Sequence, residues 1–453
     1  MSPATRFFLS ACEEAQFPGD ASWLRAFRAQ QLARFNRLGV PDRKREAWRY
    51  SPMHLFHQPV HLPEKTCLAL IPDDLEPLLW SQEGGPLITL VNGRFQPQLS
   101  HLQSLPQGVV INSLGRQLEQ DGDQVKKYLQ QADGLFEEDP FALLEQACLQ
   151  DGLYLQIPSG VQIAEPVHLL HLCVGSEEAT WQPMHHLVVA GSASQLTLVE
   201  HYATLNPSSQ PLIQTISQVW LGQGAVVDHL WLQQEGHRTK HLSHMVVQQK
   251  AESQFTSHTF SLGGLFARHQ LDLTLAEQGA QCQLFGLIMA DEQRQGELHI
   301  QVDHRVPHTS SSALHHGLLA GRGKGVFRAN VTIHPDAQQS QAVQRNANLL
   351  LSPTAEVDTL PQLRVLADDV SCRHGASVGE LDREALLYLR SRGLGEDEAK
   401  RLMVHAFTQE IIGTIGHPKL KTWLDDLLLQ EITRSHVNRQ AAGLKQEAHD
   451  ERI

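Results

Sequence analysis

A cysteine and a histidine near the C-terminal third of the chain, Cys372 and His374, have the spacing of a metal-ligand pair. Residues two apart in an extended segment project to the same side of the backbone, so this thiol and imidazole could reach one soft ion or one cluster edge. Iron-sulfur clusters need several such ligands, mostly thiolates. The pair therefore predicts half of a site, with the other half supplied by another chain.

The adjoining segment Gly375-Ala376-Ser377-Val378-Gly379 matches the G-x-S-x-G pattern of a serine nucleophile. That pattern works only at a strand-to-helix turn of a doubly wound sheet, with an acid and a histidine further along the chain. The residues after Gly379 are few and have a helical pattern, and no alternation of strands and helices precedes them. A serine hydrolase using Ser377 is the alternative enzyme hypothesis, and the surrounding pattern disfavours it.

The glycine cluster from Gly321 to Gly325, GRGKG, resembles part of a phosphate-binding loop. A true loop of that kind has the form G-x-x-x-x-G-K-[ST] and leads from a strand into a helix. Here the strand-like sequence VFRANVTI follows. We therefore predict a turn at this position and no nucleotide site of the chain's own.

The chain has 26 histidines, and several recur at close spacing. Residues four apart in a strand share a face but lie about 13 Å apart, which is too far for one ion. Hydrogen-bonded or solvated surface histidines are the expected default. The spaced pairs are His168 with His171, His241 with His244, and His304 with His308.

Composition narrows the class of protein. The 453 residues carry a net charge of -13, and the longest basic run is the short Arg43-Lys44-Arg45, so a nucleic-acid groove is not expected. No window approaches the roughly 18 apolar residues of a membrane span, which predicts a soluble, cytoplasmic protein. The six cysteines lie far apart without a C-x-x-C pair, so most are expected to be small buried residues.

The first 150 residues have a mixed pattern. Ser22 opens an apolar helical stripe that ends at Gly39, and Asn92-Gly93 lies between apolar residues as a hairpin turn does. After Gly379 the helical period returns. One apolar stripe of these later helices consists of Leu402, Met403, Ala406 and Phe407.

The middle of the chain has the alternating pattern of strands, with connectors that contain glycine but no Asn-Gly turn. Such spacing allows a sandwich, a barrel or a parallel solenoid, and periodicity alone does not choose among them. Candidate strands are centred near residues 196, 219, 227, 244, 256, 271, 284, 300, 315 and 327.

Five longer motifs are Arg45-Glu46-Ala47-Trp48-Arg49-Tyr50, Asn348-Leu349-Leu350-Leu351-Ser352, Pro361-Gln362-Leu363, Ala367-Asp368-Asp369-Val370 and Tyr388-Leu389-Arg390-Ser391-Arg392-Gly393. With Cys372-x-His374-Gly375 they resemble the SufB/SufD family of the SUF iron-sulfur cluster assembly system. The resemblance runs from Gly325 to Phe407, and Cys372-x-His374-Gly375 places the chain on the SufD side, because SufB chains typically have His-Glu-Ala there. Arg373 departs from the serine that is common between this Cys and His, which leaves the role of Cys372 open.

The resemblance implies a right-handed parallel β-helix core flanked by N-terminal and C-terminal helical regions. On this basis residues 1–150 form the N-terminal mixed region, 151–378 the β-helix, 379–432 the C-terminal helical domain, and 433–453 a polar tail. The tail is expected to be a frayed helix or disordered.

The resemblance further implies a non-catalytic scaffold that pairs with SufB and docks the SufC ATPase. A transient iron-sulfur cluster would be shared with SufB, with His374 as a ligand or proton-handling group and Cys372 as the weaker candidate. The stripe of Leu402, Met403, Ala406 and Phe407 is the expected SufC-docking surface. No feature of the sequence supports a bound flavin, and the isolated chain as a homodimer stays open.

Overall fold

The computed structural model describes residues 2–14, 21–62, 70–80, 85–102, 105–175, 179–206 and 208–450, with no side chains described beyond residue 434. Cys67 lies outside the described residues. The helices are α1 (Pro3–Glu14), α2 (Ser22–Leu38), α3 (Leu114–Ala132), α4 (Pro140–Ala147), α5 (Arg383–Ser391), α6 (Glu396–Ile412) and α7 (Pro418–Asp450), with short 3₁₀ turns η1 (Glu46–Trp48), η2 (Met53–Phe56), η3 (Pro72–Asp74), η4 (Glu76–Leu78), η5 (Pro97–Leu99) and η6 (Asp133–Phe136).

Two long sheets form the body of the molecule. One contains β1 (Leu87–Val91), β2 (Arg94–Phe95), β5 (Val167–Cys173), β7 (Gln195–Thr204), β9 (Val226–Gln234), β11 (Gln254–Ser261), β13 (Gln281–Ala290), β15 (Ser310–Leu319), β17 (Gln341–Leu350) and β19 (Ser371–Gly379). The other contains β3 (Val110–Ser113), β4 (Leu153–Ile157), β6 (Trp181–Ala190), β8 (Leu212–Leu221), β10 (Lys240–Gln249), β12 (Phe266–Leu275), β14 (Gln295–His304), β16 (Lys324–Ile333) and β18 (Glu356–Val365).

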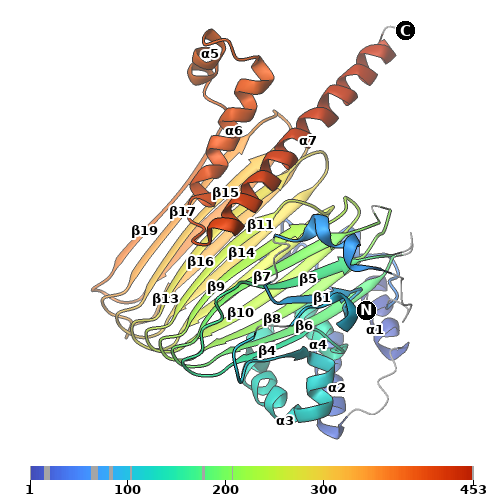
Figure 1. Ribbon diagram of the computed structural model, residues 1–453, viewed down its shortest axis with the longest axis vertical. Helices are drawn as coiled ribbons and strands as arrows, with labels where there is room; N and C mark the ends of the chain where they lie inside the picture. The colour runs from blue at the N-terminus through green and yellow to red at the C-terminus, as the bar shows by residue number, and fades with distance from the viewer. Residues whose placement is uncertain are drawn as a thin grey trace.

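The chain alternates between the two sheets, so each coil adds one strand to each of them. From β4 onward the first sheet takes the odd-numbered strands and the second the even-numbered ones, and the sheets are named accordingly the odd-numbered and the even-numbered sheet. From β4 onward, each strand pairs in parallel with the strand two positions later, such as β13 with β15 and β14 with β16. This winding is a parallel β-solenoid, as Figure 1 shows. It confirms the parallel β-helix and rules out the sandwich and the barrel that periodicity had left open.

All ten predicted strand positions fall inside strands, from residue 196 in β7 to residue 327 in β16. The earlier strands β5 and β6 were missed because nearly every residue in them is buried. A strand covered on both faces has no alternating pattern to detect. The Asn92-Gly93 hairpin is confirmed, because β1 and β2 pair antiparallel across it with positive φ at both residues.

One turn of the solenoid repeats the same backbone conformation in successive coils. The residue with positive φ donates its backbone N–H to a carbonyl of the next coil; Glu252 donates to Gln278 at 2.9 Å, for example. The equivalent residues are Ala193, Gly224, Glu252, Gly279, His308 and Gln339. This ladder of turns fixes how each coil stacks on the one before.

Helices cover opposite parts of the solenoid. The N-terminal helices pack against the outer face of the even-numbered sheet, where rings of Phe8, Phe141 and Trp181 meet at 5.6 to 6.0 Å. Helices α6 and α7 pack on the outer face of the odd-numbered sheet. In the part of the chain that the structure describes, no helix is long and apolar enough to cross a membrane.

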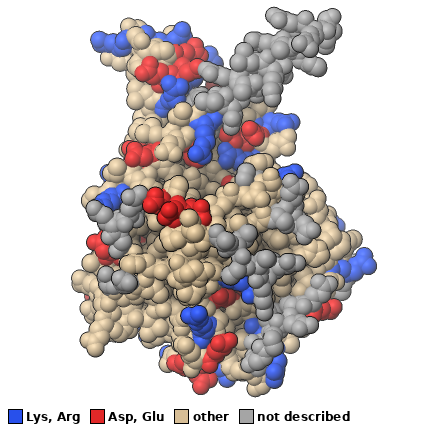
Figure 2. Space-filling view, turned by 45° about the vertical axis from the view of Figure 1, so that its right-hand side comes forward, with Lys and Arg blue, Asp and Glu red and all other residues tan. Residues whose placement is uncertain are grey.

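The C-terminal helices α5 and α6 extend past the last coil, at the top of Figure 1. No residue of α5 is buried, whereas α6 buries Val404, Ile411 and Ile412 against the solenoid. Acidic and basic side chains lie side by side on this projecting region (Figure 2). The segment predicted as a polar tail continues α7 in helical conformation to Asp450.

Candidate functional site

Cys372 and His374 lie on β19, the last strand of the odd-numbered sheet. In the parallel register, Cys372 is opposite Ala342 of β17 and His374 is opposite Gln344. Ala342 is fully buried in the solenoid interior, and Gln344 is 2% exposed. Both candidate side chains therefore continue the inner face, as their two-residue spacing predicted, at the end of the solenoid where no further coil covers them.

Cys372 is the more enclosed of the two. Its side chain packs partly against the interior cluster, and burial raises the pKa of its thiol, although a hydrogen bond with the backbone of Ala342 opposes this. Arg373 is opposite Val343, on the other face of the strand, so its charge does not activate the thiol. The thiol stays protonated at neutral pH, whereas His374 is exposed.

The interior becomes polar just beneath this pair. The Asn348 side-chain amide donates to the backbone carbonyl of Ser377 at 3.2 Å, which ties β17 to β19. Thr359 of β18 donates to Asn346 at 2.8 Å, which joins the two sheets across the interior. Gln344 donates to the carbonyl of Gln362 at 3.5 Å, but its own side-chain oxygen has no partner. A buried oxygen without a donor thus lies under His374.

The predicted docking stripe on α6 is partly exposed and partly packed against the solenoid. Leu402 is 47% exposed and Ala406 is also exposed, while Met403 is half-buried. Phe407 turns toward the solenoid, where its ring stacks on His316 at 4.3 Å. Only the outer part of the stripe is available to a partner. Leu387 and Tyr388 of α5, 62% and 57% exposed, add to the same projecting region.

Comparison with known proteins shows which family has a sequence like that of this solenoid. Residues 172–407 match the family model described as SUF system FeS cluster assembly, SufBD core domain. The preceding residues 84–169 match the SufBD protein N-terminal region.

The chain belongs to the SufBD family.

Relatives cover most of its length. A SufBD family protein of Synechocystis is 30% identical over 72% of this chain and 74% of its own. The iron-sulfur cluster assembly protein SufD of Escherichia coli is 28% identical over 86% of this chain and 89% of its own. SufD of Bacillus subtilis is 24% identical over 95% and 98%. The SufBD family acts in iron-sulfur cluster assembly.

The hydrolase alternative does not fit the SufBD fold. Ser377 lies within the extended strand β19, whereas a nucleophile elbow requires the serine at a sharp strand-to-helix turn. The glycine cluster is the turn that was predicted: Gly321 has a φ of 58°, and β16 begins at Lys324. A Cβ on Gly323 would lie 2.2 Å from the carbonyl oxygen of Ala290, so only glycine fits there.

The prediction of solvated surface histidines was wrong for five of the six histidines in the spaced pairs, and His308, at a turn, is exposed as predicted. His168, His171, His241, His244 and His304 are each 5% exposed or less. Parallel stacking buries both faces of most strands, so a histidine in the solenoid is enclosed whichever way it points. Several are held by polar groups; His304, for example, lies 2.8 Å from the hydroxyl oxygens of both Thr309 and Ser311.

One buried constellation escaped sequence reasoning. His171 of β5, His186 of β6 and Glu200 of β7 each place a ligand atom within 4.8 Å of the others. Their separations of 15 and 14 residues match no local metal motif. Only the coil register, which the sequence pattern did not reveal in this region, brings them together.

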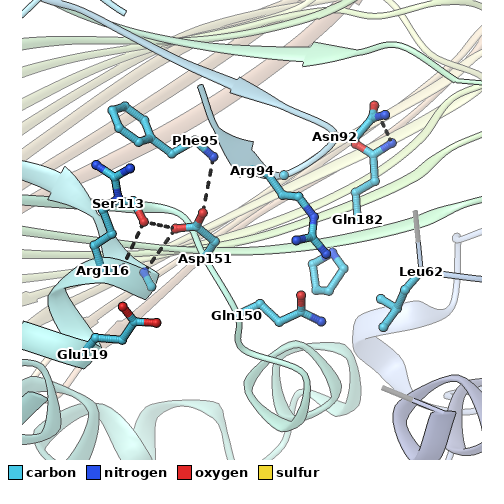
Figure 3. Close-up of a pocket in the computed structure, with 13 residues that line it drawn as sticks. Leu62, Asn92, Arg94, Phe95, Ser113, Arg116, Glu119, Gln150, Asp151 and Gln182 are labelled. Atoms are coloured by element: carbon cyan, nitrogen blue, oxygen red, sulfur yellow. Dashed lines mark hydrogen bonds between the residues drawn. The ribbon is translucent and has the colours of Figure 1, made fainter. Parts of the chain in front are cut away.

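A cavity of about 300 Å³ lies at the other end of the solenoid, between the β1–β2 hairpin and the start of α3 (Figure 3). One of its two carboxylates, Asp151, accepts hydrogen bonds from the hydroxyl of Ser113 and from the backbone N–H groups of Gly115, Gly152 and Phe95. Asp151 therefore caps α3 and anchors the hairpin. The cavity lies far from Cys372 and His374, and the role of Asp151 in it is structural.

Proposed function

We infer that this chain is a non-catalytic scaffold subunit for iron-sulfur cluster assembly, which pairs with SufB at the open end of the solenoid. The observation that supports it is the uncovered last coil. Among the strands that the structure describes, β19 pairs only with β17 and β18 only with β16, so each has one edge of backbone N–H and C=O groups without a strand partner. Such an edge is suited to pairing with another sheet.

Apolar side chains at this end support an interface as well. Val365 and Leu366 are 41% and 46% exposed, and Val378 on β19 is 50% exposed. Exposed apolar side chains along one uncovered coil are typical of an interaction surface. A SufB chain paired here would cover them and would bring its own ligands to Cys372 and His374.

His374 is the principal site residue in this proposal. It is exposed at the open end, and we assign its imidazole as the ligand or proton-handling group. Cys372, with its raised pKa, is the secondary candidate, because a metal ion would have to displace its thiol proton. The nascent cluster or its precursors would be substrate shared with SufB.

SufC would dock on the projecting helices. The outer part of the α6 stripe is Leu402 and Ala406, bordered by half-buried Met403, and α5, which contacts α6, exposes Leu387 and Tyr388. Phe407 instead holds α6 to the solenoid. A SufC subunit bound to helices that stand clear of the last coil could transmit its nucleotide cycle to the SufB interface.

The test of the site is the substitution His374→Ala in cells that depend on this pathway. We expect cluster build-up to stop while SufB and SufC still co-purify with the chain. Arg373→Ala is the matched control, because it removes a side chain from the opposite face of the same strand. Cluster assembly at the wild-type rate in His374→Ala would refute the site assignment.

The docking surface is tested separately. Leu402→Asp should reduce the SufC recovered with the tagged chain and leave SufB recovery unchanged. Glu398→Gln, at an exposed position of the same helix, should change neither. Normal SufC recovery with Leu402→Asp would show that the ATPase binds elsewhere.

A further inference from the structure

Inside the first coils of the solenoid, His171, His186 and Glu200 converge from both sheets. We propose that these three side chains bind a divalent first-row transition metal ion, of the class of Fe²⁺, Co²⁺ and Zn²⁺, separately from the open end of the solenoid. Each offers one ligand atom, and the three atoms lie within 4.8 Å of one another.

All three side chains point into the interior. Leu169 and Cys173 flank His171, Met184 and Val188 flank His186, and Leu198 and Tyr202 flank Glu200; all six flanking residues belong to the interior cluster. Since alternate residues of a strand share a face, the three ligands face inward as well. Each is 3% exposed or less.

The imidazole nitrogens are the strongest indication of a ligand. Both ring nitrogens of His171 and Nε2 of His186 are buried without a hydrogen-bond partner among the residues that the structure describes. Buried polar atoms of a folded protein are normally satisfied, and leaving one without a partner is costly. Two neutral imidazoles beside a carboxylate are the donor set that proteins use for zinc and non-haem iron.

The surroundings hold the carboxylate in position. Glu200 accepts hydrogen bonds from the Tyr202 hydroxyl and from Nε2–H of His229, which lies at 3.2 Å. His229 is fixed in turn by Ser257 at 3.1 Å. The ring of Tyr202 also stacks on His171 at 4.3 Å. Outer groups of this kind orient metal ligands and preserve their geometry.

His186 must change its hydrogen bonding when the ion binds. Its Nδ1 accepts the backbone N–H of Leu153 at 3.0 Å, so the ring proton resides on Nε2 in the free protein. When the ring proton moves from Nε2 to Nδ1, this bond is lost and Nε2 presents its lone pair to the ion. One metal–nitrogen bond thus replaces one hydrogen bond, and the ring loses no proton overall.

The test uses the full chain, stripped of metal and then loaded with Co²⁺ or Zn²⁺. We expect one ion per chain to survive desalting, with the visible absorption bands of Co²⁺ bound by nitrogen and oxygen. His171→Gln and Glu200→Gln should each lower the retained metal about 10-fold or more. His304→Gln is the control, because it removes an equally buried imidazole whose two nitrogens have other partners.

Burial provides a second measurement that needs no variant. A chelator should remove the ion from the wild-type chain slowly, over hours, whereas histidines at the surface release metal at once. X-ray absorption of the Zn²⁺-loaded chain should show two imidazoles in the first shell. Rapid loss of all metal, or equal retention in folded His171→Gln, would overturn the proposal and leave an ordered water molecule as the occupant.

Discussion

Burial sets the chemistry of the imidazole rings in this chain. Loss of water lowers the pKa of His186 and His201 to about 4 and that of His315 to about 3, so these rings are neutral at pH 7. His374, in contrast, is exposed at the end of the solenoid. The residue type alone did not separate these groups, because position within a coil decides exposure.

A residue in the turn ladder allows a test of backbone strain. Glu252 has a φ of 55°, a conformation that disfavours every residue with a Cβ. Glu252→Gly should therefore raise the free energy of unfolding by about 0.5 to 1 kcal/mol, after the extra flexibility of glycine is deducted. Urea unfolding followed by circular dichroism measures it.

The control for this prediction is the equivalent turn one coil later. Gly279 has a φ of 74°, and a Cβ there would lie 2.9 Å from Cγ of Glu252. Gly279→Ala should lower the free energy of unfolding by about 1 kcal/mol or more. If Glu252→Gly also destabilised the chain, the ladder would tolerate side chains without strain.

At the scale of elements, one buried ion triad joins the N-terminal helices to the solenoid. His244 of β10 lies 2.9 Å from Asp139, which caps the N-terminus of α4, and 2.8 Å from Asp272 of β12. Burial alone would lower the pKa of His244, but the two carboxylates raise it to about 9. The ring is therefore an imidazolium at neutral pH, and it holds α4 against the sheet.

This triad predicts a loss of stability in alkali. A pKa raised from 6.5 to about 9 in the folded state stabilises it fully below pH 6.5, and the benefit disappears as the pH rises through 9. The loss should be on the order of 2 to 3 kcal/mol. Urea unfolding at pH 7 and pH 10 measures it, and His244→Gln should flatten the dependence. Parallel pH profiles for both chains would contradict the role of His244.

Some elements of the fold could be predicted from the sequence, and others could not. Strands with one polar face, such as β12 and β16, were predicted from their alternation, and the hairpin at Asn92-Gly93 from its two positive-φ residues. The pairing of Cys372 with His374 on one face followed from the period of a strand. Strands buried on both faces, and sites such as His171 with Glu200, depend on the coil register, which local patterns do not encode. The sequence likewise did not distinguish the exposed residues of the α6 stripe from those that pack against the solenoid.

On the scale of the whole molecule, buried neutral histidines make the fold sensitive to acid. His201 and His258 lie under the C-terminal helices, where burial lowers the pKa of each to about 4. His201 faces the ring of Trp423 on α7, and His258 lies 3.0 Å from the Thr414 hydroxyl just after α6. Protonation of either would place an uncompensated charge beneath these helices.

The expected result is a steep fall in stability below neutral pH. The unfolded chain binds these protons near pH 6.5 and the folded chain only near pH 4, so stability is complete above pH 6.5 and is lost as the pH falls toward 4. Each such group contributes on the order of 3 kcal/mol. Unfolding midpoints in urea at pH 7.5, 6 and 5 measure the trend, and a midpoint unchanged at pH 5 would contradict it.

The uncovered last coil also affects how much of this protein can accumulate in a cell without aggregating. An exposed strand edge pairs with any available strand, and natural proteins avoid leaving one free because it promotes aggregation. Strands β18 and β19 offer such an edge together with Val365, Leu366 and Val378. Chains whose last coil stays uncovered would stack end to end or precipitate. On the proposed pairing with SufB, balanced synthesis of the two subunits would follow from the fold itself, apart from any need of the chemistry.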